Sequence, residues 1–147
     1  MRSDIRRRVK QLIEEYKTIE PEELALRMGI GVLSCELPQA TKGFCLMLSQ
    51  GTAIVVNQNL SLIERRACVA HELGHAVLHK GFNYMFMSQN TQMVTGKFER
   101  EANLFAAYLI LESENVCEGE TIENFSRKNH LSYKALEQIM GEKALEM

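Results

Sequence analysis

Apolar residues near the start of the chain recur with the 3.6-residue period of an amphipathic helix. The stripe of this first predicted helix comprises Ile5, Val9, Leu12, Ile13 and Tyr16. A second, shorter helix is predicted after it, because Pro21 suits the first helical position and Gly29 suits the C-terminal stop. The first 29 residues are therefore expected to form two helices.

Three short runs with strand character follow the two helices. They span residues 30–37, 44–49 and 52–56. Gln50-Gly51, between the second and third runs, predicts a tight hairpin.

The pattern after the strands is helical. Ser61 and Glu64 have the capping-box spacing, which predicts a helix that runs to about Lys80. The remaining predicted elements are a loop over 81–96, a helix over 97–111, a polar loop over 112–120 and helices over about 122–128 and 133–140. This order favours an α+β fold in one domain, residues 1–147, with a small three-stranded, mainly antiparallel sheet. The C-terminal helical pair, about residues 121–147, would complete that domain.

Composition and charge narrow the class of protein. The formal net charge of −2 gives no general attraction to nucleic acid or to an anionic membrane. The longest apolar run, Leu104–Leu111, is far shorter than the roughly 20 residues of a membrane span, and no apolar signal segment follows the basic N-terminus. The four cysteines form no C-x-x-C pair and are expected to be small buried hydrophobes, although Cys68 lies near the segment discussed next. We therefore expect a cytoplasmic protein.

The candidate chemistry lies in His71-Glu72-Leu73-Gly74-His75, an H-E-x-x-H motif inside a predicted helix. Two histidines four residues apart lie about 40° apart around a helix axis and about 6 Å apart along it, so both imidazoles can reach one ion at the 2.0–2.1 Å that zinc prefers. Glu72 is turned about 100° from His71 and is better placed to reach a water on the metal. We expect one zinc ion here.

His79 continues the same spacing but is not expected to bind the ion. It lies two turns, about 12 Å, from His71, too far for three nitrogens to meet at one metal. The metzincin pattern also fails, because Leu78 stands where a glycine is needed and Gly81 where a histidine is needed. His79 is therefore expected to pack in the core or to contact one of the metal-binding side chains without binding the ion itself.

The third ligand is expected from the predicted helix over 97–111. Glu99 and Glu101 flank its apolar stripe on opposite sides, so helical geometry alone does not choose between them. Asn103 lies on the same face as Glu99, one turn later, and could orient a ligand histidine through its second ring nitrogen. This favours Glu99, with Glu101 as the fallback.

Four segments together carry a resemblance to a known family. They are AIVVN (53–57), ERR (64–66), HELGHAVLH (71–79) and EREANLFAA (99–107). Over roughly residues 10–111 the chain resembles the ImmA/IrrE family of metallo-endopeptidases. H-E-x-x-H alone indicates only a broad zincin group, whereas its combination with the downstream E-x-x-A-N-x-F-A is specific. The family often continues with Leu-Leu-x-Pro, whereas this chain has Leu109-Ile110-Leu111-Glu112.

The resemblance implies a zincin-like fold and a zinc-dependent endopeptidase of gluzincin type. By resemblance, His71 and His75 are zinc ligands, Glu72 is the general base and Glu99 is the third ligand. The implied substrate is a protein, namely a helix-turn-helix repressor of a mobile element or a stress regulon. In similar zincins the strand before the metal-binding helix is an edge strand that pairs with extended substrate, and the resemblance implies this role for residues 52–56. Tyr84, Tyr108 and His79 are the candidates for an additional donor to the oxyanion formed during peptide hydrolysis.

Two other classes of function are weighed against the peptidase. The pattern of residues 121–147 resembles a helix-turn-helix. However, the charges of their four basic and four acidic side chains sum to zero, so direct nucleic-acid binding is not expected. In the other alternative the protein binds a metal ion but is not an enzyme. In that case the protein would be a regulator that binds a repressor or an antitoxin partner.

Overall fold

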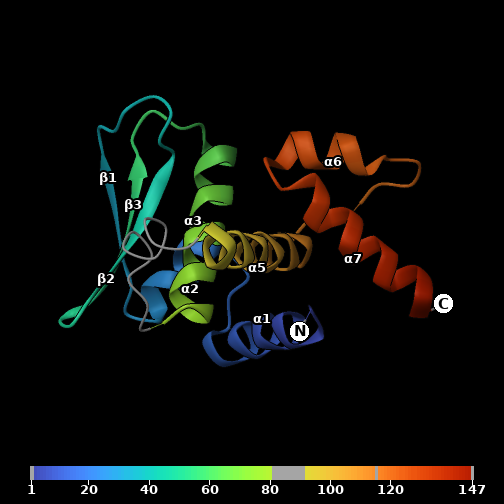
Figure 1. The fold of residues 1–147 in the computed structure, drawn as a ribbon, viewed down its shortest axis with the longest axis horizontal. Helices are drawn as coiled ribbons and strands as arrows, with labels where there is room; N and C mark the ends of the chain where they lie inside the picture. The colour runs from blue at the N-terminus through green and yellow to red at the C-terminus, as the bar shows by residue number, and fades with distance from the viewer. Residues whose placement is uncertain (1, 81–91, 115, 147) are drawn as a thin grey trace.

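The computed structural model describes residues 2–80, 92–114 and 116–146. Its elements are α1 (Arg2–Tyr16), α2 (Pro21–Arg27), β1 (Gly31–Cys35), β2 (Gly43–Leu48), β3 (Gly51–Asn57), α3 (Leu62–Leu78), α5 (Gln92–Leu111), α6 (Ile122–Asn129) and α7 (Tyr133–Glu146). The sheet lies on one side of α3 and α5 on the other, with α6 and α7 beyond α5 (Figure 1). The predicted α+β fold is confirmed.

The three strands form a mixed sheet in the order β1-β3-β2. β1 runs parallel to β3, and β2 pairs with β3 in the expected antiparallel hairpin. The expectation of a mainly antiparallel sheet was therefore wrong for one of the two pairings. An apolar pattern shows that a segment is a strand but not which partner it has, and the connection after β1 carries the chain across to the far edge.

β3 is the central strand, so it offers no free edge to a peptide. The expectation that residues 52–56 pair with substrate at a sheet edge was wrong. Ile54, Val55 and Val56 are all buried, which is the pattern of a strand covered on both faces rather than of an edge strand. Among the described residues, the edges of the sheet belong to β1 and β2.

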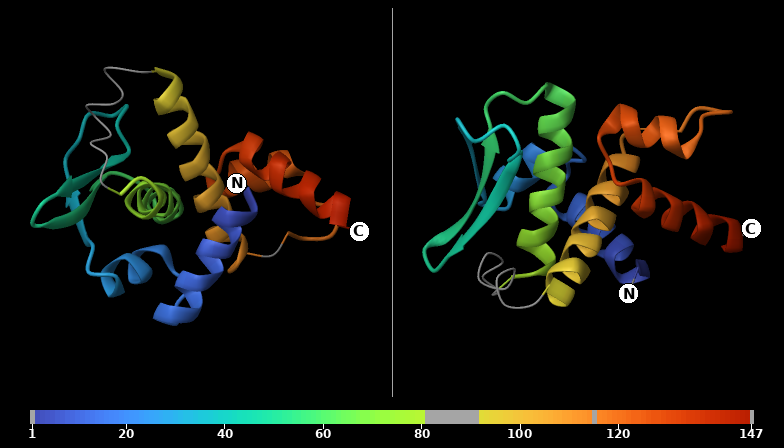
Figure 2. Two further views of the ribbon diagram at one scale, coloured as in Figure 1. Left: turned by 60° about the horizontal axis from the view of Figure 1, so that its bottom comes forward. Right: turned by 45° about the horizontal axis from the view of Figure 1, so that its top comes forward.

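Helix α3 begins at the predicted capping box and lies between the sheet and α5. The Ser61 side chain accepts a hydrogen bond from the backbone N–H of Glu64, and the Glu64 carboxylate accepts one from the backbone N–H of Ser61. Val69 and Leu73 of this helix are fully buried in the core. Figure 2 shows α3 almost end-on on the left, enclosed by the sheet, α2 and α5.

Helix α5 begins at Gln92, five residues before the predicted start. Gly96 was taken as the end of a loop, but it lies inside the helix, where glycine costs only about 1 kcal/mol relative to alanine. The predicted apolar stripe is otherwise confirmed, since Ala102, Phe105 and Leu109 are fully buried. The rest of the predicted loop, residues 81–91 with Tyr84, lies outside the described residues.

The C-terminal helices α6 and α7 form the expected pair and pack on α5. Phe125 of α6 and Leu136 of α7 are buried in the same core as the other helices. The Tyr108 hydroxyl on α5 donates a 2.8 Å hydrogen bond to Glu142 on α7. No helix within the described residues is long and apolar enough to cross a bilayer.

Candidate metal centre

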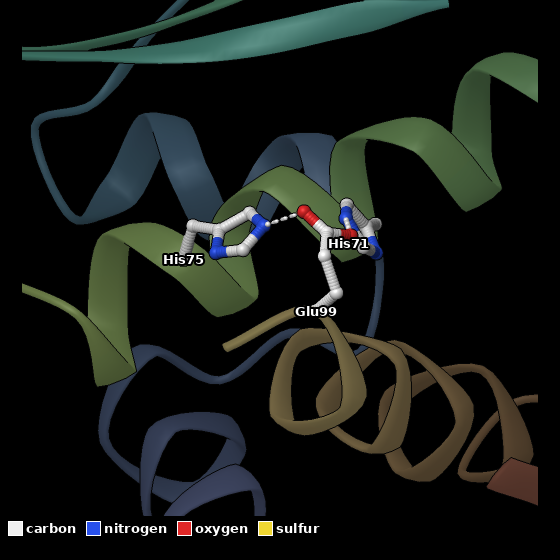
Figure 3. Close-up of side chains that lie close together, drawn as sticks. All are labelled: His71, His75 and Glu99. Atoms are coloured by element: carbon white, nitrogen blue, oxygen red, sulfur yellow. Dashed lines mark hydrogen bonds and ion pairs between the residues drawn. The ribbon is translucent and has the colours of Figure 1, made fainter. Parts of the chain in front are cut away.

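Three side chains from two helices converge between α3 and α5. His71 and His75 extend from consecutive turns of α3, and Glu99 reaches them from α5 (Figure 3). The Glu99 carboxylate lies between the two rings: one oxygen is 3.0 Å from Nε2 of His71 and the other is 3.1 Å from Nε2 of His75. The ring centroids of the two histidines are 4.9 Å apart.

Gly74 allows the two helices to approach closely enough for this convergence. A Cβ atom at Gly74 would lie 3.1 Å from Cα of Ala102 and 3.1 Å from Cβ of Phe105, both on α5. Contacts this short are tighter than ordinary van der Waals packing, so a larger residue would push α5 away from α3. The glycine inside the H-E-x-x-H segment therefore helps to place Glu99.

The donor set fits a divalent metal ion. The ligand atoms of His71, His75 and Glu99 lie within 4.8 Å of one another. Four ligands at 2.0–2.1 Å around a tetrahedral ion lie about 3.3 Å apart, so only small side-chain adjustments separate the observed distances from that geometry. Imidazole nitrogens combined with a carboxylate oxygen are a common ligand set for zinc.

Glu72 lies beside this cluster rather than within it. Its Oε2 is 4.0 Å from Nε2 of His71, and its side chain is only 12% exposed. Burial is the main cause that raises the pKa of the Glu72 carboxyl, although the neighbouring histidines oppose it. A carboxylate with a raised pKa accepts a proton more readily, which suits a base.

A cavity of about 350 Å³ opens onto the cluster from the side of His71. His71, Glu72 and Asn103 line it together with Lys42, His130 and Ser132. The last three residues were missed in the sequence, because Lys42 precedes β2 and the other two lie in the turn between α6 and α7. Nothing in their spacing relates them to the H-E-x-x-H motif.

Asn103, one turn after Glu99 on α5, contacts His71 through a side-chain hydrogen bond. Burial acts to lower the pKa of the His71 imidazole, but it is outweighed by the Glu99 and Glu72 carboxylates and by a hydrogen bond with the Asn103 side chain. The net effect is that the pKa of His71 is raised. The structure thus gives His71 one polar partner besides the carboxylates.

His79 and Glu101 are paired with each other on the opposite side of His75. His79 Nε2 is 3.0 Å from Oε1 of Glu101, and neither residue belongs to the convergent cluster. Between the two acids considered from sequence, the structure therefore brings Glu99 to the histidines of the motif and Glu101 to His79. Burial is the main cause that lowers the pKa of the His79 imidazole.

Two further expectations concern Tyr108 and Cys68. The hydroxyl of Tyr108 is bonded to Glu142, and Tyr108 does not line the cavity, so its position does not favour the role of oxyanion donor. The Cys68 thiol lines the cavity but does not belong to the cluster of possible ligands. Burial raises the pKa of Cys68 to about 12, so it is a protonated thiol at neutral pH.

The sequence of the chain matches the model of a known protein family. Residues 25–118 match the Peptidase M78 family, described as the IrrE N-terminal-like domain. The chain belongs to this peptidase family. The matched segment contains His71, Glu72, His75 and Glu99, whereas the cavity residues His130 and Ser132 lie beyond it.

The chain is also similar to two curated proteins. An uncharacterized immunity region protein 2 of Bacillus phage phi105 is 41% identical over 107 residues, which cover 73% of this chain and 68% of the relative. Metallopeptidase ImmA of Bacillus subtilis (strain 168) is 28% identical over 130 residues, which cover 88% of this chain and 76% of the relative. The family resemblance recognised in the sequence is confirmed, and membership supports a peptidase that acts on a protein substrate.

Proposed function

We propose that the protein is a zinc-dependent endopeptidase with its metal held by His71, His75 and Glu99. The observation that carries the proposal is the convergence of two imidazole Nε2 atoms and one carboxylate on a common centre. The ligand chemistry favours zinc. The metallopeptidase name of the Bacillus subtilis relative adds support.

In this proposal Glu72 performs the proton transfers. When bound, the zinc ion supplies a Lewis acid that lowers the pKa of a water molecule and polarises the scissile carbonyl. Glu72 accepts the proton of the attacking water and passes it to the nitrogen of the leaving amine. Asn103 orients the His71 ring, and Glu72 lines the cavity through which substrate and water reach the site.

The edge of β2 is the surface on which we place an extended substrate. Among the described residues β2 pairs only with β3, so its other edge has backbone groups available to a peptide. β2 also lies against the metal-binding helix: a Cβ atom at Gly43 would be 2.7 Å from the Cys68 sulfur. Lys42, directly before β2, lines the cavity beside Glu72.

We propose a helix-turn-helix repressor of a mobile element or a stress regulon as the substrate. The family resemblance supports this choice, as does the name of the phage relative, an immunity region protein. Incubation of the purified protein with the repressor encoded beside it tests the substrate, with cleavage into defined fragments as the expected result. An intact repressor that binds the protein tightly would instead favour the non-catalytic regulator.

Glu72→Gln tests the enzymatic mechanism. The amide is close in shape to the carboxylate but cannot accept the proton, so we expect repressor cleavage to fall by about 10²–10⁴-fold while one zinc ion stays bound. Glu137→Gln, the same change at an exposed position on α7, is the matched control and should cleave normally. Undiminished cleavage by Glu72→Gln would overturn the assignment of the base.

A further inference from the structure

A second chain of polar contacts lies behind His75, on the side away from the carboxylate of Glu99. Nδ1 of His75 is 2.9 Å from Nδ1 of His79, and Nε2 of His79 is 3.0 Å from Oε1 of Glu101. Both histidines are only 2% exposed. The ring of Phe98 stacks on His79 at a centroid distance of 3.9 Å and an interplanar angle of 16°, which fixes the orientation of that ring.

The chemistry of these groups gives the hydrogen bonds one direction. A carboxylate only accepts, so the Glu101 oxygen accepts a hydrogen bond from Nε2–H of His79. A neutral imidazole with its proton on Nε2 has a lone pair on Nδ1, which accepts from Nδ1–H of His75. When His75 donates Nδ1–H to His79, its Nε2, which lies 3.1 Å from Oε1 of Glu99, is the nitrogen left to bind a metal ion together with that carboxylate.

We propose that Glu101 and His79 are positioning residues that hold His75 in the tautomer able to bind a metal ion. This inference rests on the proposed metal site and extends it to two residues that are not ligands. The placement of the two helices supports it: His79, the C-cap of α3, lies one turn after His75. Glu99 and Glu101 extend from α5 to His75 and to His79, respectively.

A packing role alone does not account for this arrangement. An apolar residue could fill the space beneath Phe98, but the buried pair of Nδ1 atoms at 2.9 Å requires one donor and one acceptor. Partners of this kind orient a ligand histidine and raise its basicity, and their loss typically costs 10–100-fold in metal affinity. That effect on affinity, rather than on folding, distinguishes the two roles.

The test compares zinc affinity among purified full-length variants by chelator competition. His79→Phe keeps the aromatic stack on Phe98 and removes both hydrogen bonds, so we expect zinc to bind 10–100-fold more weakly. Glu101→Gln keeps an acceptor oxygen but loses the charge, and its loss of affinity should be smaller. Glu137→Gln should bind zinc as the wild type does.

The hydrogen bond from Nδ1–H of His75 is a second readout, observed in the zinc-loaded protein. In the ¹⁵N-labelled, zinc-loaded protein, we expect the Nδ1 proton of His75 to show the chemical shift of a hydrogen-bonded N–H, and His79→Phe should remove that signature. If His79→Phe fails to fold, Glu101→Gln decides, because Glu101 lies at the edge of the core with 17% of its side chain exposed.

Two results would contradict the positioning role of His79 and Glu101, and both can be told apart from the absence of a metal site. Wild-type zinc affinity in both variants, or an Nδ1 proton of His75 without the signature of a hydrogen bond in the zinc-loaded wild type, would show that the chain of contacts does not position His75. If the wild-type protein bound no zinc, the proposed site itself would be wrong.

Discussion

The two histidines of the H-E-x-x-H motif lie in different surroundings. His71 faces the cavity, with 21% of its side chain exposed and with Glu72 and Asn103 nearby. His75 is 2% exposed and is backed by His79, Glu101 and Phe98. One side of the site is thus open to a substrate and water, while the other is closed and held by buried contacts. The open side is suited to chemistry, and the closed side is suited to fixing the ligand geometry.

Replacing each motif histidine in turn should have the largest effects, and the two variants should differ in their free energy of unfolding. Both His71→Ala and His75→Ala should abolish tight zinc binding. In the metal-free protein, His75→Ala should also lower the free energy of unfolding by about 2–4 kcal/mol, because it opens a cavity and leaves a buried nitrogen of His79 without its partner. His71→Ala should cost less than about 1 kcal/mol.

Urea denaturation of the metal-free variants measures this difference. Equal midpoints for the two variants would show that the closed side contributes no more to stability than the open side.

Gly74→Ala should disturb the contact between α3 and α5 on which both sides depend. The added methyl group meets backbone atoms of Ala102 at 3.1–3.2 Å, and overpacking of this kind costs about 1–3 kcal/mol, partly offset by the better helix propensity of alanine. Zinc affinity should fall as well, because α5 carries Glu99.

Gly141→Ala is the matched control for this substitution. Gly141 also lies within a helix, but a Cβ atom there has no neighbour within 4 Å, so alanine should stabilise the protein by up to about 1 kcal/mol. Thermal unfolding and zinc titration of both variants give the comparison, and equal stability changes would be inconsistent with a close approach at Gly74.

Asn103→Ala should have a smaller effect than the substitutions on the closed side. Water from the cavity can replace the lost amide beside His71, whereas no such replacement reaches the buried ring of His79. We expect zinc affinity to fall by no more than about tenfold. If Asn103→Ala lost more zinc affinity than His79→Phe in the same chelator competition, the open side rather than the closed side would fix the ligand geometry.

The smallest expected effect is a difference in the rates at which the four cysteines are alkylated. Burial, with a smaller contribution from the Glu72 charge, raises the pKa of Cys45 and of Cys68 to about 12, so about 10⁻⁴ of each is thiolate at pH 8. Cys35 and Cys117 are exposed, so the expectation that the four cysteines are buried was wrong for these two. Iodoacetamide at pH 8 should label two thiols quickly, and mass spectrometry identifies them. Rapid labelling of Cys68 would show that its side of the cavity is more open than the structure indicates.

Local patterns predicted most elements of this fold and the two histidines that converge with Glu99 between α3 and α5. The Ser61 capping box and the spacing of His71 and His75 are properties of a single helix, so the sequence is sufficient to interpret them. The parallel pairing of β1 with β3 depends on the path of the chain between strands, which no periodicity encodes. The start of α5 was misplaced because Gly96, often a helix terminator, is tolerated inside this helix.

The choice between Glu99 and Glu101 shows the same limit within the site. Both acids flank the buried stripe of α5, and only the rotation of α5 against α3 directs one to the histidines of the motif and the other to His79. Likewise, His130 and Ser132 reach the cavity through the packing of α6 and α7, which is tertiary information.

X-ray diffraction at the zinc absorption edge, from crystals of the protein loaded with zinc, tests the central claim most directly. The account predicts one anomalous peak, bonded at 2.0–2.2 Å to Nε2 of His71, Nε2 of His75 and a carboxylate oxygen of Glu99, with Glu72 next to the remaining position. A peak bonded to His79 or Glu101, or no ordered zinc at these residues, would contradict it.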